Sequence, residues 1–153
     1  MNLVKNVIKL SLIITLISFF LHLIWEYAQC IPFFNHEKLQ PTHQAMLMAT
    51  LGDILLTYIA YIFVTTVKKD WLWPLKKWDF KILFGLIIVS LVLSISIELR
   101  ALSTGRWSYS EINPLLLNKV SIIPILQLLI LFPLTFYLSR LLFVKYTQSR
   151  HAN

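Results

Sequence analysis

Long runs of apolar residues, separated by short polar segments, dominate the chain. A helix needs about 20 apolar residues to cross roughly 30 Å of hydrocarbon. Four runs are long enough, and they cover residues 7–28, 46–67, 82–102 and 120–144. None alternates strictly between apolar and polar residues, so a membrane β-barrel is not indicated. The pattern predicts an all-α, polytopic membrane protein in which residues 1–153 form a single transmembrane domain, a four-helix bundle.

Turn and capping residues lie near the ends of these runs. Thr42 offers a capping hydroxyl to the second helix. Thr104 and Gly105 are expected to end the third, because glycine accepts the left-handed conformation that closes a helix. Asn118 is expected to cap the fourth helix, and Pro133 to kink it. The first run is expected to be retained rather than cleaved as a signal peptide.

Composition supports the membrane assignment. Of the 153 residues, 58% are hydrophobic and 14% charged, whereas soluble proteins carry about 25% charged residues. The single cysteine, Cys30, excludes an internal disulfide, a CxxC redox pair and a four-thiolate zinc site. The net charge of +7 lies between the apolar runs, which favours a membrane surface over nucleic acid. No phosphate-binding loop, dinucleotide fingerprint or nucleophile elbow is present.

The basic residues predict an orientation in the cell (inner) membrane. The N-terminal segment, the middle loop and the C-terminal end together hold ten Lys and Arg residues. The other two loops hold four, namely Lys38, Arg100, Arg106 and Lys119. Because positive charge stays inside, both termini are expected to be cytoplasmic. Trp71, Trp73 and Trp78, interleaved with the lysines of the middle loop, are interpreted as an interfacial anchor.

Polar residues within the runs recur every three or four positions and form one stripe on each helix. The stripes comprise Ser11, Thr15, Ser18, His22, Glu26 and Gln29; Thr50, Asp53, Thr57 and Tyr61; Ser90, Ser94 and Glu98; and Gln127. Such stripes avoid lipid, so they are expected to face one another inside the bundle. The hydroxyl groups are interpreted as interhelical hydrogen-bonding groups.

The acidic residues are predicted to share one depth. Glu26, Asp53 and Glu98 each lie 15 to 17 residues from a basic residue near the cytoplasmic boundary. At about 1.5 Å per residue they stand roughly 20–27 Å above that boundary, in the outer part of the bilayer. Gln127 is predicted to share this layer, and His22 lies one turn deeper on the face of Glu26.

This layer is the candidate site. Three ionised carboxyl groups would repel one another, so at least one is expected to be protonated, or paired with His22, Arg100 or Arg106. A buried protonated carboxyl can act as a general acid. The candidate catalytic residues are Glu26, Asp53, Glu98 and His22. The candidate substrate-binding residues are Trp25, Gln127, Arg100, Arg106, Trp107 and Tyr109. The two arginines could instead be interfacial anchors, and Trp107 and Tyr109 an aromatic belt.

A metal site was weighed against this interpretation. His22 and Glu26 could both reach one ion, with Asp53 or Glu98, or with His36 or His43 from the first loop, completing the shell. No second histidine falls within a run, and no HExxH motif occurs. We therefore expect no metal and no other cofactor.

Several short strings carry a resemblance. Residues 21–29 (LHLIWEYAQ), 52–53 (GD) and 104–109 (TGRWSY), with Glu98, Pro124 and Gln127, are similar to a group of small bacterial four-helix integral membrane proteins that is uncharacterised. This resemblance covers most of the chain and implies a fold but no activity. More loosely, the Trp-Glu pair and the glutamate before Gly-x-Trp-x-Tyr resemble membrane terpenoid and carotenoid cyclases and hydratases. That likeness implies embedded carboxyl groups that protonate alkenes or epoxides.

The leading hypothesis is an enzyme doing acid-type chemistry (isomerisation, cyclisation or hydration) on a hydrophobic, isoprenoid- or lipid-like substrate from the outer leaflet. One acid would donate the proton and a second would stabilise the cation, aided by Trp25, Trp107 and Tyr109. The alternatives are a small-solute or proton-coupled transporter, with a polar path continuing towards Thr65 and Lys68, and an assembly subunit with an outward-facing acid. Expected partners are membrane lipid, the hydrophobic substrate and possible further copies of the chain as a homo-oligomer, but not nucleic acid.

Overall fold

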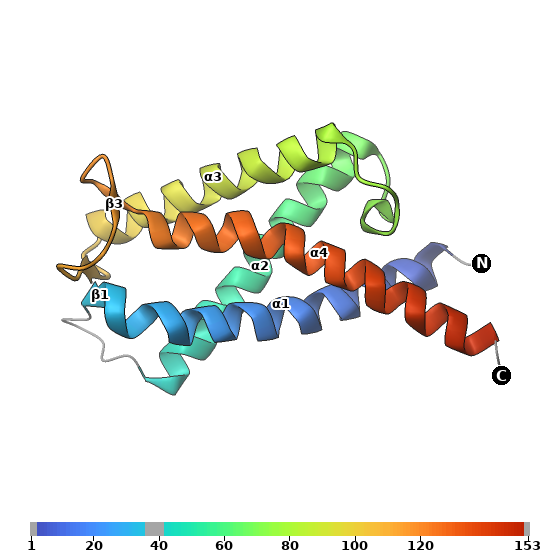
Figure 1. The fold of residues 1–153 in the computed structure, drawn as a ribbon, viewed down its shortest axis with the longest axis horizontal. Helices are drawn as coiled ribbons and strands as arrows, with labels where there is room; N and C mark the ends of the chain where they lie inside the picture. The colour runs from blue at the N-terminus through green and yellow to red at the C-terminus, as the bar shows by residue number, and fades with distance from the viewer. Residues whose placement is uncertain (1–2, 36–41, 152–153) are drawn as a thin grey trace.

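Four long helices make up most of the described structure, and they run alternately up and down (Figure 1). The computed structural model describes residues 3–35 and 42–151. The helices are α1 (Leu3–Phe33), α2 (His43–Lys68), α3 (Phe80–Ser103) and α4 (Ile122–His151). All four are long and apolar enough to cross a membrane, which confirms the prediction of four spans and of a multi-pass membrane protein. Both termini lie at the same end of the bundle (Figure 1).

The helix ends agree with most of the capping predictions. The Thr42 hydroxyl accepts the Ala45 N–H at 3.2 Å, and Gly105 follows α3 with a φ of 61°. The prediction for Asn118 is wrong. Asn118 has a φ of 55° and turns the chain within a hairpin, so α4 begins only at Ile122 rather than at residue 120. The Ser121 hydroxyl accepts the Ile123 N–H at 3.2 Å and caps the helix instead.

Each helix packs mainly against its neighbours in the sequence, and α4 closes the ring against α1. In Figure 1, α2 and α3 lie close together near the loop that joins them and diverge toward the other end of the bundle. A Cβ atom at Gly85 in α3 would lie 3.5 Å from the Phe63 ring of α2, an ordinary van der Waals distance, so the two helices are in contact there. The bundle is therefore tighter between α2 and α3 at the end that carries the termini.

Two pairs of short strands close the opposite end of the described structure, which we call the hairpin end because one of the pairs is a hairpin. β1 (Phe34–Asn35) pairs with β2 (Ser108–Tyr109), and β3 (Leu115–Leu116) pairs with β4 (Val120–Ser121), both antiparallel. The Ser110 hydroxyl donates to the Pro32 carbonyl at 2.7 Å. The Asn113 amide donates to the Phe33 carbonyl at 2.6 Å. These bonds hold residues 104–121, which we call the hairpin segment, over the end of α1.

The end that carries the termini, which we call the terminal end, contains a buried tryptophan. A 3₁₀ turn, η1 (Trp73–Leu75), lies between α2 and α3. Trp73 is only 1% exposed, and its indole donates to the Tyr61 carbonyl at 3.4 Å. The prediction that it anchors the interface is therefore wrong for Trp73, which belongs to the core. Trp71, 50% exposed, keeps the expected position at the surface.

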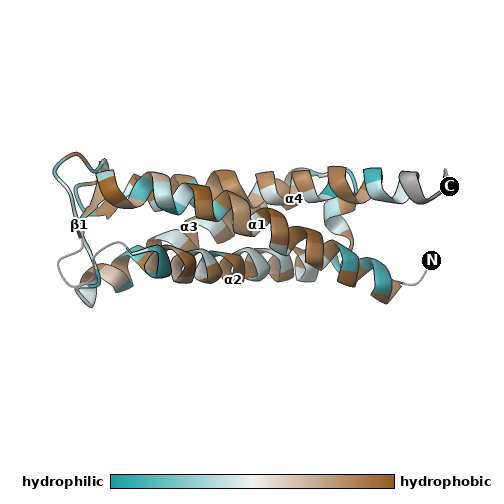
Figure 2. Ribbon diagram, turned by 90° about the horizontal axis from the view of Figure 1, so that it is seen from below, coloured by the Kyte–Doolittle hydropathy of each residue, from teal (hydrophilic) through white to brown (hydrophobic). Residues whose placement is uncertain are grey.

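Buried apolar residues fill the bundle from its middle to the terminal end. This apolar core comprises Leu10, Ile14, Ala60, Tyr61, Val64, Trp73, Ile82, Leu86, Val89, Leu128, Phe132, Phe136 and Phe143. Apolar side chains also cover the outside, including Leu12, Ile24, Leu55 and Val92. Figure 2 shows hydrophobic residues along the length of the helices and hydrophilic ones mostly toward the two ends. An apolar exterior of this extent suits contact with lipid rather than water.

Candidate functional site

A hydrogen-bonded group of polar side chains joins α1, α2 and α4 in the half of the bundle nearer the hairpin end. We call it the acidic cluster, and it comprises Trp25, His22, Glu26, Gln29, Asp53 and Gln127. His22, Gln29 and Gln127 are buried, and the Asp53 side chain is 15% exposed. The structure therefore brings together two of the three predicted acids, with the predicted histidine and Gln127.

Gln127 is the centre of this cluster. Its amide nitrogen lies 2.9 Å from Asp53 Oδ2, 3.2 Å from Glu26 Oε1 and 3.1 Å from His22 Nδ1. A side-chain amide has two hydrogens, so it cannot serve all three acceptors at once. Glu26 also accepts a hydrogen from the Gln29 amide at 2.7 Å, so the two Gln127 hydrogens remain for Asp53 and His22.

Trp25 orients the two amide groups. Its indole N–H donates to Gln29 Oε1 at 2.9 Å, and an indole nitrogen can only donate. The Gln29 amide nitrogen therefore faces the other way, donating to Glu26 Oε1 at 2.7 Å and to Gln127 Oε1 at 3.1 Å. Gln127 must then present its nitrogen to the acids. Trp25, predicted to bind substrate, thus has a positioning contact in this structure.

The Nε2 atom of His22 shows which ring nitrogen carries the hydrogen of a neutral imidazole. The Thr57 hydroxyl donates to the Asp53 backbone carbonyl at 2.9 Å, so His22 Nε2, 3.3 Å from that hydroxyl, is the donor in their contact. A neutral imidazole protonated at Nε2 has a bare lone pair on Nδ1. That nitrogen lies 3.3 Å from Asp53 Oδ2. Both atoms can accept from the Gln127 amide, and a proton shared between them would turn their contact into a hydrogen bond.

The charges of the cluster also favour a shared proton. The Glu26 and Asp53 carboxyl groups interact directly, and two ionised carboxylates so close would repel each other. Within residues 3–35 and 42–148, His22 is the only basic side chain within 4.0 Å of either. A proton shared within the cluster would relieve this repulsion.

The hydrogen-bonded network ends near the middle of the bundle. It reaches Ser18, whose hydroxyl lies 2.9 Å from that of Thr57. Beyond this point lie Ile14 and Phe132, both 0% exposed, and the Phe132 ring centroid is 6.4 Å from that of His22. Among the described side chains, no hydrogen bond continues from Ser18 towards Thr65. The acidic cluster therefore faces the apolar core on its inner side.

Glu98 lies in a second polar group, which we call the Glu98 cluster. Its carboxyl group is 1% exposed and accepts the Tyr109 hydroxyl hydrogen at 2.5 Å. The Tyr109 oxygen accepts the Ser121 backbone N–H at 3.1 Å, and the Trp107 indole lies beside the carboxyl. Burial, and then the hydrogen bond to Glu98, raise the pKa of Tyr109, so its hydroxyl remains a donor. This cluster ties α3, the hairpin segment and α4 together.

The prediction of one layer of three acids therefore holds for Glu26 and Asp53 but not for Glu98. Ser121, which faces the Glu98 cluster, precedes Gln127 by six residues, or about 9 Å along α4. In the described part of the chain, no hydrogen bond or ion pair joins the two clusters. The depth estimate failed because Lys9 is the seventh residue of α1 whereas Lys81 is the second of α3, so they do not mark one boundary.

The two predicted arginines lie outside both clusters. Arg100 and Arg106 are exposed, and the Arg106 guanidinium lies 5.1 Å from the Trp107 ring centroid. Within the described ranges, neither forms an ion pair with an acid. This placement agrees with the alternative that they are interfacial anchors.

The described residues do not bring together the side chains that a metal site would need. Among these residues, no group of three or more His, Cys, Asp or Glu side chains could hold a metal ion. His43 lies 2.6 Å from the Tyr27 hydroxyl rather than near the acidic cluster. His36 and Lys38 lie outside the described residues.

Sequence reasoning missed three polar contributors. Gln29 was placed on the stripe of α1 but not in the site, although its position three residues after Glu26 puts it on the same face. Asn113 and Ser121, whose side chains bond to each other at 2.8 Å, lie in the hairpin segment. No periodic pattern marks residues there, so the sequence offered no signal for them.

Comparison with protein-family models, with curated proteins and with solved structures found no match. The functional interpretation therefore depends on the chemistry of the acidic cluster.

Proposed function

We propose that this protein is a multi-pass enzyme of the cell (inner) membrane, with both termini cytoplasmic, that carries out acid-type chemistry on a hydrophobic, isoprenoid- or lipid-like substrate. The ten basic residues at the terminal end, against four in the other loops, support the orientation. In this orientation the acidic cluster lies in the outer half of the bilayer, where a hydrophobic substrate of the outer leaflet would reach it.

The contact of the His22 and Asp53 side chains, 3.3 Å apart, carries this proposal, because the two groups could share a proton. Transfer of that proton to a carbon of a double bond leaves a neutral imidazole, or a carboxylate, and creates a carbocation on the substrate. Glu26, which lies beside Asp53, would stabilise that cation by its negative charge, and the Trp25 ring would add a cation–π contact. Loss of a neighbouring proton to the cluster completes an isomerisation or cyclisation, and capture of water completes a hydration.

The inner end of the network favours an enzyme over a transporter. A solute or proton crossing the bundle would need a polar path through the apolar core, where Phe132 and Phe136 are 0% exposed. An enzyme whose substrate arrives from one leaflet needs access from one side only. The Glu98 cluster would serve this enzyme by holding the hairpin segment in place over the bundle, with Tyr109 as its central donor.

A proton-coupled transporter remains the second candidate because of two threonines. The Thr65 and Thr135 hydroxyls are buried in the terminal half and have no hydrogen-bond partner in the described structure. Water entering beside them would extend the polar network towards the terminal end. If the protein is a transporter, proton flux into liposomes that contain it should depend on both threonines. If it is an enzyme only, no proton flux is expected.

Lipid-phase mass spectrometry tests the proposal. Membrane extracts are compared between cells without the gene and cells expressing the wild-type protein, Asp53→Asn or Glu26→Gln. We expect a lipid-soluble compound that wild-type protein converts to an isomer, or to a product heavier by one water, and that both variants leave unconverted. Glu111→Gln is the matched control, because Glu111 is an exposed acid in the hairpin segment, and it should behave as wild type. Identical extracts from all cells would overturn the proposal.

A further inference from the structure

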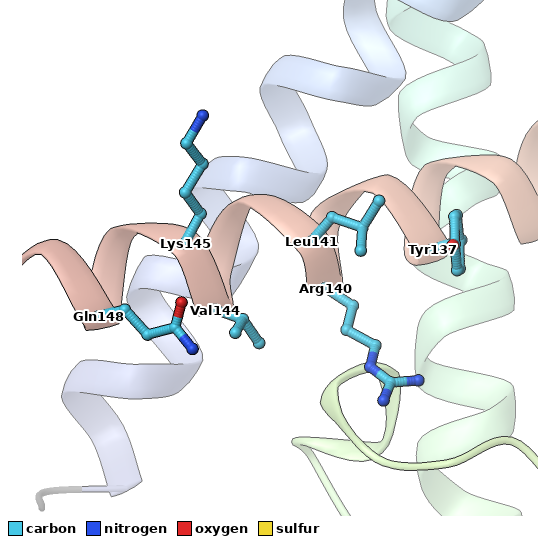
Figure 3. A pocket seen from close by; sticks show the side chains of 6 residues that line it. All are labelled: Tyr137, Arg140, Leu141, Val144, Lys145 and Gln148. Atoms are coloured by element: carbon cyan, nitrogen blue, oxygen red, sulfur yellow. The ribbon is translucent and has the colours of Figure 1, made fainter.

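The last turns of α4 carry a surface hollow far from the acidic cluster. It is lined by Tyr137, Arg140, Leu141, Val144, Lys145 and Gln148 (Figure 3). Positions four apart lie on one side of a helix, so these residues form two neighbouring rows. One row runs Tyr137, Leu141, Lys145, and the other Arg140, Val144, Gln148. Each row places an apolar side chain between polar ones.

Two positive charges of this hollow are not neutralised by the protein. Two other cations at the terminal end are paired: Lys68 lies 2.6 Å from Asp79, and Lys76 lies 2.8 Å from Asp70. In the described ranges, no acidic group lies within 4.0 Å of Arg140 or Lys145. Figure 3 shows Arg140 extending toward the loop between α2 and α3, and Lys145 pointing away from it. The two charges therefore flank the apolar pair Leu141 and Val144.

With the spans and orientation proposed above, the hollow would also lie at the depth of a lipid headgroup. Arg140 follows Gln127 by 13 residues, or about 20 Å along α4. It lies at the end of the bundle that carries most of the basic residues. Tyr137 and Leu141 are half exposed, at 50% and 48%, and tyrosine is typical of the membrane interface. A free phosphate would leave these apolar side chains uncovered, whereas a phospholipid would cover them and neutralise the cations.

We propose that this face of α4 binds an anionic phospholipid, with Arg140 holding its phosphate group and Lys145, on the other side of the apolar pair (Figure 3), adding positive charge. The guanidinium of Arg140 offers a paired donor geometry that matches phosphate oxygens. Tyr137, Leu141 and Val144 contact the glycerol and acyl part of the lipid, and the Gln148 amide lies in reach of a headgroup hydroxyl. The site is independent of the acidic cluster and of the reaction proposed for it.

Native mass spectrometry of the full chain, released from nanodiscs of equal phosphatidylglycerol and phosphatidylcholine content, tests this site. Wild-type protein should retain more phosphatidylglycerol than phosphatidylcholine, by roughly five-fold for each basic residue that contacts the lipid. Arg140→Gln/Lys145→Gln should lose the preference, and Arg140→Lys/Lys145→Arg should keep it. The matched control, Arg106→Gln/Lys119→Gln, removes the same charge at the hairpin end and should also keep it. If the double glutamine variant does not fold, each single variant should show about a five-fold loss.

Three outcomes would overturn the proposal. Equal retention of both lipids by wild-type protein would mean that the hollow has no headgroup preference. Equal loss in the variant and in the matched control would mean that net charge, and not this hollow, attracts the lipid. Displacement of the retained lipid by an excess of sodium phosphate would mean that the site takes free phosphate instead.

Discussion

The two halves of the bundle solve the same packing problem with different chemistry. In the terminal half, aromatic rings meet directly: the Trp73 and Phe136 centroids lie 4.9 Å apart, and that of Tyr61 lies 6.2 Å from each. In the half nearer the hairpin end, the same space between helices holds the acidic cluster. Inside a membrane, helices associate through close packing and interhelical hydrogen bonds, and here each half relies mainly on one of them.

This difference separates stability from chemistry. Packed rings in the terminal half of the described structure stabilise the bundle without a carboxyl or imidazole group among them. The acidic cluster places two carboxyl groups and a histidine in a low-dielectric environment, which costs free energy and is typical of functional sites. We therefore expect mutations in the terminal half to change mainly the free energy of unfolding. Mutations of the acidic cluster should change mainly the activity.

Phe136→Ala should have the largest effect on stability. The ring is 0% exposed, and its removal leaves a cavity among Tyr61 and Trp73, so the free energy of unfolding should fall by about 3 kcal/mol. Thermal unfolding in detergent measures this change. Phe84→Ala is the control, because Phe84 is 51% exposed and its loss should have little effect. Equal destabilisation by both variants would show that the core is not the main source of stability.

Gln127→Leu should destabilise less but abolish the proposed activity. The substitution removes the donor that bridges Glu26, Asp53 and His22, but Glu26 keeps the Gln29 amide and Asp53 keeps its contact with His22, so the unfolding free energy should fall by about 1–3 kcal/mol in all. Both the unfolding midpoint and the lipid product should be followed. Gln148→Leu, an exposed glutamine on the same helix, is the control. Normal product formation by Gln127→Leu would remove the acidic cluster from the reaction.

Tyr109→Phe tests whether the two clusters are separate. It removes the hydroxyl that joins Glu98 to the Ser121 backbone, and the unfolding free energy should fall by about 1 kcal/mol. Product formation should persist, because no hydrogen bond joins this hydroxyl to the acidic cluster in the described structure. A complete loss of product with an unchanged unfolding midpoint would place Tyr109 and Glu98 in the chemistry after all.

The smallest predicted effect is on the pH dependence of the stability, through Asp79 at the terminal end. Asp79 accepts from Lys68 at 2.6 Å and from the Ile82 N–H at 3.1 Å, and these bonds lower the pKa of Asp79 below its ordinary value. Its contribution to stability is therefore present at neutral pH and is lost as the pH falls through the lowered pKa. Asp79→Asn should show a smaller drop in unfolding temperature between neutral pH and about pH 3 than wild type. A drop as large as in wild type would exclude Asp79 as a source of acid sensitivity.

The sequence predicted the helices well and the site in part. Runs of apolar residues determine the spans directly, and stripes at three- and four-residue steps placed His22, Glu26 and Asp53 on facing surfaces. The position of Glu98 could not be predicted, because it depends on how far each helix extends past the membrane boundary. Tyr109 and Ser121 come from a hairpin segment without periodicity. Their contact with Glu98 depends on tertiary packing that no local pattern records.

The central claim of the proposed function is that, at neutral pH, the acidic cluster holds one proton more than two carboxylates and a neutral imidazole would carry. Infrared spectroscopy of the protein in lipid tests it directly, because a protonated carboxyl and an imidazolium each give a distinct band. We predict that wild-type protein shows one of these bands at neutral pH, that Asp53→Asn removes it, and that Glu98→Gln leaves it unchanged. A wild-type spectrum with neither band, or one that Asp53→Asn leaves intact, would contradict the claim.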